Sequence, residues 1–262
     1  MNSAIRPPSK TSGFSLIEIA VVLLIISILI TIVAIPLTTQ LDMQKTADTN
    51  KQLEQIKEAV YGFAMANGRL PCPATATSAG VERYCTNASG GCGAETTVLP
   101  HGRCVVTVGW VPARTLGLAP VDANGFSVDA WADGSDLHRH RYAVSPYQSP
   151  VDKYVLTSVD GIKTPTMSTV SASLHLYLCA TGLTAAPPTT DCGTMTVLSD
   201  KAPFVLYSLG KSTAQNSFDE TNNQNNDIVF TQGIQSPTFD DLVTWGSLNT
   251  LFARLVQAGK LP

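Results

Sequence analysis

A long apolar run near the N-terminus constrains this chain more than any other feature of its sequence. Residues 1–13 are polar and carry Arg6 and Lys10, whereas no charged side chain occurs from Ile19 to Gln40. A helix rises about 1.5 Å per residue, so about 20 apolar residues cross a hydrocarbon core of about 30 Å. We therefore expect residues 14–37 to span a membrane, with the basic leader in the cytoplasm and the rest exported.

Glu18 is the single ionisable side chain within this apolar stretch. A charge inside a bilayer costs roughly 2.5 to 3.5 kcal/mol on insertion scales, so a carboxylate there needs a partner. Cleavage between Gly13 and Phe14 would create an α-amino group about one helical turn away. The same amine on a neighbouring subunit would attract Glu18 by about 4 kcal/mol at 4 Å, before desolvation, at an effective dielectric constant of about 20. Glu18 is therefore predicted to favour stacking of subunits in register.

Other kinds of export segment fit less well or stay open. A secretory signal needs a small-x-small cleavage site, and Ile32-Val33-Ala34 fails at its first position. A lipoprotein needs a cysteine directly after the apolar run, and the first cysteine is Cys72. A plain signal anchor remains an alternative.

The residues from Gly13 to Glu18, GFSLIE, follow a short basic leader and resemble the prepilin cleavage and methylation signal. This signal is typical of type IV pilins and type II secretion pseudopilins. The resemblance implies that a prepilin peptidase cuts after Gly13, that Phe14 becomes N-methylated, and that Glu18 guides subunit docking. It does not separate a pilus from a pseudopilus.

The same resemblance implies a domain organisation and a location. Residues 1–13 would be the removed leader, 14–68 the N-terminal pilin helix, and 69–262 an exported head. The prepilin would cross the bacterial inner membrane once, in contact with its lipids. The mature chain would then join other pilin or pseudopilin subunits, through an inner-membrane assembly platform, in a filament in the periplasm or on the cell surface.

Beyond the apolar run the pattern predicts an amphipathic helix and then a β-rich head, which is an α+β fold. The helix should end near Asn67-Gly68. The resemblance implies an antiparallel sheet packed on it. A short C-terminal helix should begin after Ser247, which can cap it, and end near Gly259. The apolar stripe comprises Leu53, Ile56, Val60, Phe63 and Ala64. The predicted strands are 104–110, 141–145, 154–159, 174–179, 194–198, 204–209 and 228–231.

Six cysteines follow the apolar segment, which fits disulfides formed in an oxidising compartment. They lie at Cys72, Cys85, Cys92, Cys104, Cys179 and Cys192. Six cysteines allow 15 pairings. We predict only the pair of Cys179 with Cys192, which encloses a polar, proline-containing loop.

A stretch rich in Asn and Asp offers the hard oxygen ligands that Ca²⁺ prefers, six to eight at about 2.3 to 2.6 Å. The candidate ligands are Asp219, Glu220, Asn222, Asn225 and Asp227. A mobile polar loop that binds no metal is the alternative.

Composition and motifs favour a structural protein over an enzyme. The formal charge is −3, so nucleic acid is not an expected partner, and the one local basic cluster is His138–Arg141. No P-loop, GxSxG motif or nucleophile beside a histidine occurs. The length exceeds what major subunits of the resembled family usually need, which favours a minor subunit. Two alternatives stay open: a tip subunit acting as an adhesin or DNA-uptake module, and a membrane-tethered periplasmic protein that does not polymerise.

Overall fold

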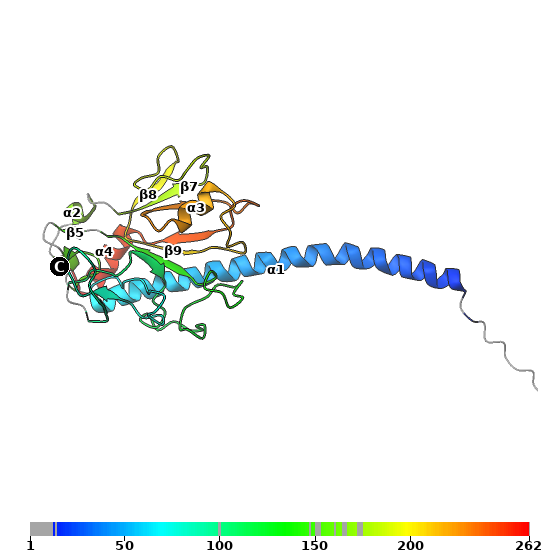
Figure 1. The fold of residues 1–262 in the computed structure, drawn as a ribbon, viewed down its shortest axis with the longest axis horizontal. Helices are drawn as coiled ribbons and strands as arrows, with labels where there is room; N and C mark the ends of the chain where they lie inside the picture. The colour runs from blue at the N-terminus through cyan, green and yellow to red at the C-terminus, as the bar shows by residue number, and fades with distance from the viewer. Residues whose placement is uncertain are drawn as a thin grey trace, which may run out of the picture. The chain divides into compact units, whose positions relative to one another are not determined.

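Helix α1 (Leu16–Asn67) is the longest element of the computed structural model, and it contributes to both units into which the chain divides. The units are residues 1–44 and residues 45–262 (Figure 1). For residues 31–37, 148–149, 153 and 171 only the backbone is described. The structure describes residues 13, 15–98, 101–146, 148–149, 153–159, 161–163, 167–171 and 175–261.

The end of α1 follows the predicted pattern, and its buried face differs at one position. Gly68 adopts a left-handed φ of 68° and donates its N–H to the Ala64 carbonyl oxygen at 2.7 Å, so the helix stops at Asn67. Tyr61 is buried, whereas the predicted Phe63 is only half-buried. Phe63 instead stacks beneath the Arg69 guanidinium, 4.8 Å from its ring centroid.

A four-stranded sheet in the order β11-β9-β4-β3 forms the centre of the second unit, and all its pairings are antiparallel. Its strands are β3 (Val108–Trp110), β4 (Arg141–Val144), β9 (Phe204–Ser208) and β11 (Leu242–Trp245). The predicted strand over 104–110 is shortened at its start. Cys104 forms a bridge with Tyr84, and Val105 donates to the Arg83 carbonyl oxygen, so these residues pair outside the sheet.

A second sheet, in the order β10-β7-β8, mixes orientations. Its strands are β7 (Leu176–Ala180), β8 (Val197–Ala202) and β10 (Val229–Gln232). Strand β10 runs parallel to β7, so the expected purely antiparallel head is wrong here. The chain between them contains helix α3 (Phe218–Gln224), which provides the crossover that a parallel pair requires.

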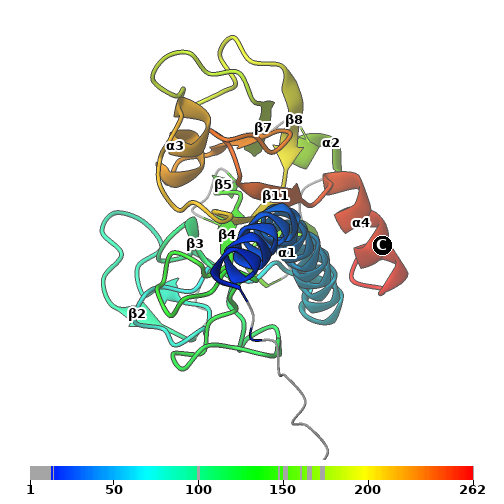
Figure 2. The ribbon, with the colours of Figure 1, turned by 90° about the vertical axis from the view of Figure 1, so that its right-hand side faces the viewer.

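The central sheet buries both of its faces. Tyr142, Val144, Phe204 and Leu206 alternate toward one face, where they pack with α1 and with α4 (Leu248–Gln257). Ala143, Val205 and Tyr207 point to the other face and pack with the second sheet. Figure 2 shows α1 and α4 beside β11 and β4, with β7, β8 and α3 beyond the sheet. The second unit is therefore layered as helices, sheet and sheet.

Helix α4 lies within the head, as its apolar pattern predicted. Leu248, Leu251, Phe252 and Leu255 are buried in the core shared with α1, whereas Val256 is 51% exposed. Ser247 stands at the N-cap position but makes no capping bond with its side chain. Its backbone N–H donates instead to the Tyr61 hydroxyl at 3.0 Å, which joins the start of α4 to α1.

The remaining elements are short. The predicted strand over 154–159 is wrong, because the chain turns directly after Tyr154 and Ser158 donates its backbone N–H to the Tyr154 carbonyl oxygen. These elements are β1 (Tyr84–Cys85), β2 (Glu95–Thr96), β5 (Gln148–Ser149), β6 (Lys153–Tyr154), the 3₁₀ helix η1 (Gly161–Lys163) and α2 (Met167–Ser171).

Three disulfides join all six cysteines within the second unit. Cys72 pairs with Cys104, Cys85 with Cys92, and Cys179 with Cys192. The last pair is the one expected from the sequence, and it forms a small core with Val229.

Candidate functional site

The first turn of α1 carries the carboxylate that the sequence singles out. Glu18 donates its backbone N–H to the Ser15 carbonyl oxygen at 3.0 Å, and its Oε2 lies 3.5 Å from the Ser15 nitrogen. Gly13 is exposed, and Phe14 lies outside the described residues, so the predicted cut between them stays a prediction. The carboxylate of Glu18 is thus at the start of the helix, within one turn of the predicted cleavage point.

The residues that follow Glu18 expose a continuous apolar surface. The large apolar side chains between Leu16 and Ile30 are each 45% to 89% exposed. Ser27 satisfies its hydroxyl within the helix by donating to the Leu23 carbonyl oxygen at 2.7 Å. Soluble monomers rarely expose an apolar surface of this extent, so it is an interaction surface for lipid or for other protein.

The described residues contain no helix with the combined length and hydropathy of a membrane span. The predicted span, residues 14–37, includes Phe14 and the side chains of residues 31–37, which lie outside the description.

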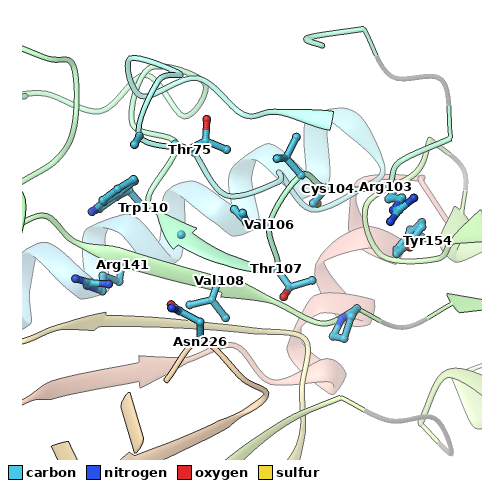
Figure 3. Close-up of a pocket in the computed structure, with 15 residues that line it drawn as sticks. Thr75, Arg103, Cys104, Val106, Thr107, Val108, Trp110, Arg141, Tyr154 and Asn226 are labelled. Carbon is cyan, nitrogen blue, oxygen red and sulfur yellow. The ribbon is translucent and has the colours of Figure 1, made fainter. Parts of the chain in front are cut away.

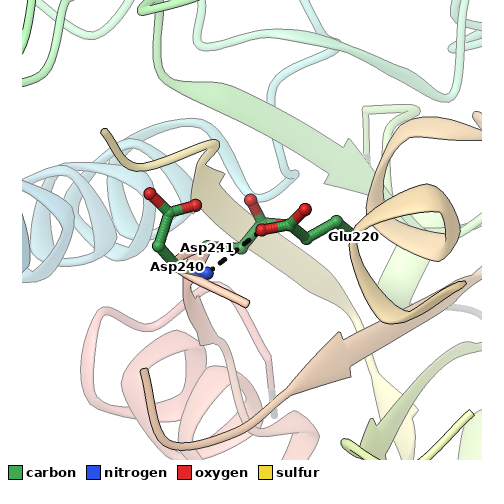
Figure 4. A group of neighbouring side chains, drawn as sticks. All are labelled: Glu220, Asp240 and Asp241. Atoms are coloured by element: carbon green, nitrogen blue, oxygen red, sulfur yellow. Dashed lines mark hydrogen bonds between the residues drawn. The ribbon is translucent and has the colours of Figure 1, made fainter. Parts of the chain in front are cut away.

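A second candidate site is a cluster of three carboxylates in the second unit. Oxygen atoms of Glu220, Asp240 and Asp241 all lie within 4.8 Å of one another. Figure 4 shows the carboxylates of Glu220 and Asp241 facing each other, with Asp240 close by. Glu220 comes from α3, which packs on β10, and the two aspartates directly precede β11, so the cluster depends on the hydrogen bonds that join α3 to the chain before β11.

Hydrogen bonds hold this cluster in place. The Glu220 carboxylate accepts from the backbone N–H of Asn216 at 2.6 Å and of Asp240 at 3.2 Å. Asn223 donates to Asp241 Oδ2 at 2.8 Å and also joins α3 to Thr231 on β10 through both atoms of its amide. The geometry of the carboxylates is therefore set by backbone groups and one buried amide.

The electrostatics of the cluster are unfavourable without a compensating charge. Burial raises the pKa of Asp241 to about 8, against the hydrogen bond from Asn223, and the charges of Glu220 and Asp240 raise it further. Burial likewise raises the pKa of Glu220. Oδ1 of Asp240 and Oδ1 of Asp241 are buried, and neither has a hydrogen-bond partner among the described residues. These two oxygens are therefore free to accept from a proton donor or to contact a cation.

Only one of the five predicted calcium ligands belongs to this cluster. Glu220 does, whereas the Asp219 carboxylate accepts from the backbone N–H groups of Gly182 and Leu183. Asp227 accepts from the Val229 backbone N–H at 2.7 Å, and burial raises its pKa to about 6. The segment is not a loop throughout, because α3 forms over Phe218–Gln224 and Ser217 caps it by accepting from the Glu220 N–H.

The two other predicted ligands also have different partners. Asn222 donates to the Thr231 hydroxyl at 2.9 Å, and Asn225 donates to the Asn222 side-chain oxygen at 3.4 Å. The sequence missed Asp240 and Asp241 as members of this site. Their adjacency just before a β-rich run was the available signal, but Asp240 is 20 positions from Glu220, and sequence alone does not show that such distant residues meet.

The basic cluster His138–Arg141 lies inside the fold for most of its length. His138, Arg139 and His140 are 7%, 7% and 1% exposed, so these three side chains do not form a basic surface. Arg139 forms an ion pair with Asp122 at 2.8 Å, which neutralises its charge. Only Arg141, half-buried at the start of β4, contributes to an open surface.

An N-terminal helix with a carboxylate in its first turn and an exposed apolar surface defines a chain that anchors or packs through that helix. Residues 8–34 match the family model of the prokaryotic N-terminal methylation motif. This motif is the prepilin-type signal of type IV pilins and pseudopilins, so the chain carries that signal. Pilin-like proteins with this motif are structural subunits that are processed by prepilin peptidase and assemble with each other. No curated protein and no solved structure matches the chain significantly.

Proposed function

We propose that this chain is a structural subunit of a type IV pilus-like or type II secretion pseudopilus filament. It is stored as a prepilin in the inner membrane, cut after Gly13, N-methylated at Phe14, and passed to an assembly platform. The observation that carries this proposal is the exposed apolar surface of Leu16–Ile30 with Glu18 in its first turn. The methylation motif over residues 8–34 supports it.

The pairing of charges explains why Glu18 matters for assembly. Inside a bundle of apolar helices, the carboxylate is costly unless a cation lies close to it. The α-amino group created by cleavage is the nearest such cation, and a neighbouring subunit can present it. Subunits stacked head to tail through one repeated contact extend as an open helical filament.

The test compares two carboxylates on the same helix. Glu18→Ala should leave membrane insertion intact and reduce the chain in sheared filaments by at least about tenfold, because the pair is worth a few kcal/mol. Glu54→Ala, an exposed position on α1, should assemble normally. Mass spectrometry of wild-type filaments should recover N-methylated Phe14. Normal filaments from Glu18→Ala, or an intact Met1 confined to the membrane fraction, would reject the proposal and favour a tethered protein.

The size of the head supports a minor rather than a major subunit. The described part of its second unit holds a four-stranded sheet, a three-stranded sheet, two two-stranded sheets and three disulfides, more than packing against one helix requires. A minor subunit should occur at a small fraction of the copy number of the main subunit. Quantitative mass spectrometry of sheared filaments measures this ratio, and a chain that forms most of the filament mass contradicts the assignment.

We also propose that Glu220, Asp240 and Asp241 hold a Ca²⁺ ion. The carboxylates supply hard oxygen ligands, and the two buried oxygens without partners are the observation that supports a cation here. When bound, Ca²⁺ supplies positive charge that offsets the repulsion between the three carboxylates and so ties α3 to the start of β11. The original candidates Asp219 and Asp227 take no part.

Thermal unfolding of the full chain in detergent tests the calcium proposal. Ca²⁺ at about 100 times its Kd should stabilise the protein by about 2 to 3 kcal/mol. Asp241→Asn should abolish this response, whereas Asp227→Asn should keep it because Asp227 lies outside the cluster. An unchanged melting temperature on adding Ca²⁺, or an equal response in Asp241→Asn, would contradict the proposal.

A further inference from the structure

A cavity of about 630 Å³ lies beside strand β3 in the second unit. This volume is within the range of about 300 to 1,000 Å³ that is usual for small-molecule sites. Figure 3 shows Trp110 and Arg141 at one end of the cavity and Arg103 and Tyr154 at the other. Its walls include strand β3 and the residues that precede it, so the cavity is elongated along the strand.

The charge of the cavity is one-sided. Arg103 and Arg141 line it, and none of its lining residues is acidic, although Asp241, which does not line the cavity, attracts Arg141. Arg103 donates to the carbonyl oxygens of Asn87 at 3.3 Å and Gly90 at 2.8 Å, and these partners, the ones seen in the described part of the chain, are neutral. The cavity therefore attracts an anionic ligand.

Two neighbouring donors in the cavity wall lack acceptors. Nε1 of Trp110 and Nε of Arg141 are buried, and neither has a hydrogen-bond partner in the described part of the chain. Trp110 and Arg141 are cross-strand partners on β3 and β4, so their side chains leave the same face of the sheet about 5 Å apart. A carboxylate offers two acceptor oxygens, one for each of two such donors.

The rest of the wall suits a ligand with both hydroxyl groups and apolar faces. Thr107, Tyr154 and Asn226 carry groups that both donate and accept hydrogen bonds, as sugar hydroxyls require. Val106, Val108 and the Trp110 ring supply apolar surface for the C–H face of a sugar ring. Asn226 adopts a left-handed φ of 60° at the turn from α3 into β10, which positions it at the cavity.

We propose that this cavity binds a carboxylate-bearing saccharide, such as a short oligomer of hexuronic acid. The carboxylate of one sugar lies against Trp110 and Arg141, and that of another reaches Arg103 at the opposite end. The site is independent of the filament role, because every lining residue lies within residues 45–262.

Nucleic acid fits the same cavity less well. A chain of phosphates is bound through many Lys and Arg contacts, and here only two arginines are present. Residues 45–262 hold 15 basic side chains against 18 acidic ones, a formal charge of −3, so the surrounding unit repels a polyanion. A short ligand with one or two carboxylates avoids this repulsion.

Calorimetric titration of the full chain in detergent with trigalacturonic acid tests the proposal, with maltotriose as the neutral trisaccharide of equal length. The neutral sugar should bind at least about tenfold more weakly, because it lacks the charged acceptors. Arg141→Gln should raise the Kd for trigalacturonic acid by about tenfold or more. Trp110→Phe, which keeps an aromatic ring and removes the N–H, should raise it several-fold.

Arg254→Gln is the matched control, because Arg254 pairs with Glu58 on α4 and α1, away from the cavity. It should leave the affinity unchanged, and circular dichroism should show that all three variants are folded. Arg103→Gln provides a second variant should Arg141→Gln fail to fold. The proposal is overturned if trigalacturonic acid does not bind, if Arg141→Gln binds it as the wild type does, or if oligo-dT or pentaglutamate binds more tightly.

Discussion

Arg69 and Glu82 form a two-bonded ion pair beneath the end of α1, with nitrogen-to-oxygen distances of 2.9 and 2.7 Å. Both side chains are nearly buried, and the Glu82 carboxylate also accepts from the Cys72 backbone N–H at 3.1 Å and from the Tyr84 hydroxyl. The pair therefore connects the turn after α1 to the first disulfide and to β1.

Glu82→Gln should lower the free energy of unfolding by about 3 kcal/mol, because removing one member of a buried pair leaves the Arg69 charge without compensation. Urea unfolding of the full chain in detergent measures this change. Glu54→Gln is the control, since Glu54 pairs with Lys57 at the surface and such pairs are worth about 1 kcal/mol or less. If the two variants lose the same free energy of unfolding, the buried pair stabilises the protein no more than the surface pair does.

The disulfides should contribute differently to the stability of the fold, because they close loops of different length. Cys72–Cys104 spans 32 residues and Cys85–Cys92 spans 7. From chain entropy we expect the free energy of unfolding to fall by about 4 kcal/mol when Cys72 and Cys104 are replaced by serine. Replacing Cys85 and Cys92 should lower it by about 2 kcal/mol. Denaturant unfolding of the two double variants checks the order, and a larger loss for the shorter loop would refute it.

Gly80→Ala should destabilise the head more than Gly134→Ala. Both glycines have left-handed φ values, 75° and 93°, so an alanine is strained at either position by about 1 to 2 kcal/mol. A Cβ at Gly80 would also strike the Gly125 carbonyl oxygen, whereas a Cβ at Gly134 meets nothing within 4 Å. We expect Gly80→Ala to lower the free energy of unfolding by about 1 to 3 kcal/mol more than Gly134→Ala does. A lower melting temperature of the Gly80 variant would show this difference. Similar melting temperatures for the two variants would mean that the backbone shifts freely there.

His140 should make the head sensitive to acid. Burial lowers the pKa of His140 to about 4, although a hydrogen bond with the Ser127 backbone opposes the shift. The unfolded chain takes up this proton near pH 6.5 and the folded chain only near pH 4, so stability is complete above pH 6.5 and falls as the pH decreases between these values. At pH 4.5 the free energy of unfolding should be about 2 to 3 kcal/mol lower than above pH 6.5 as a result of this group.

Urea midpoints from pH 7.5 to 4.5 measure this dependence. Other groups also titrate in this range, so the informative quantity is the difference between the wild type and His140→Asn. The variant should lose less stability on acidification, even where its stability at pH 7.5 is lower. Parallel curves for the two proteins would exclude His140 as the cause.

The sequence predicted the local features of the fold well, and these are set by nearby residues. The end of α1 at Asn67, the buried positions Leu53, Ile56 and Val60, and the buried face of α4 all follow from periodicity and a glycine stop. Tyr61 was missed because its burial depends on the Ser247 N–H, a partner that lies 186 residues further along the chain.

Features that depend on contacts between residues far apart in the sequence could not be predicted from periodicity or local motifs. The parallel pairing of β10 with β7 joins strands that are distant in the sequence, and Glu220 meets Asp240 and Asp241 only when α3, packed on β10, reaches the chain before β11. The oxygen-rich composition of 219–227 predicted calcium ligands there, or else a mobile polar loop. Composition could not distinguish carboxylates that face one another from those that cap a backbone turn, as Asp219 and Asp227 do.

The arrangement of the disulfides has a mechanical consequence. All six cysteines lie beyond Asn67, so no disulfide joins α1 to the sheets. The helix is held there by the packing of Leu53, Ile56 and Val60 and by hydrogen bonds such as that from Thr244 on β11 to Glu54. Tension applied along α1 is therefore resisted by apolar contacts and hydrogen bonds, which can yield and form again when the force is released. The loops closed by Cys72–Cys104 and Cys179–Cys192 cannot lengthen, so a stretched head keeps a large part of its chain short and refolds from a partly assembled state.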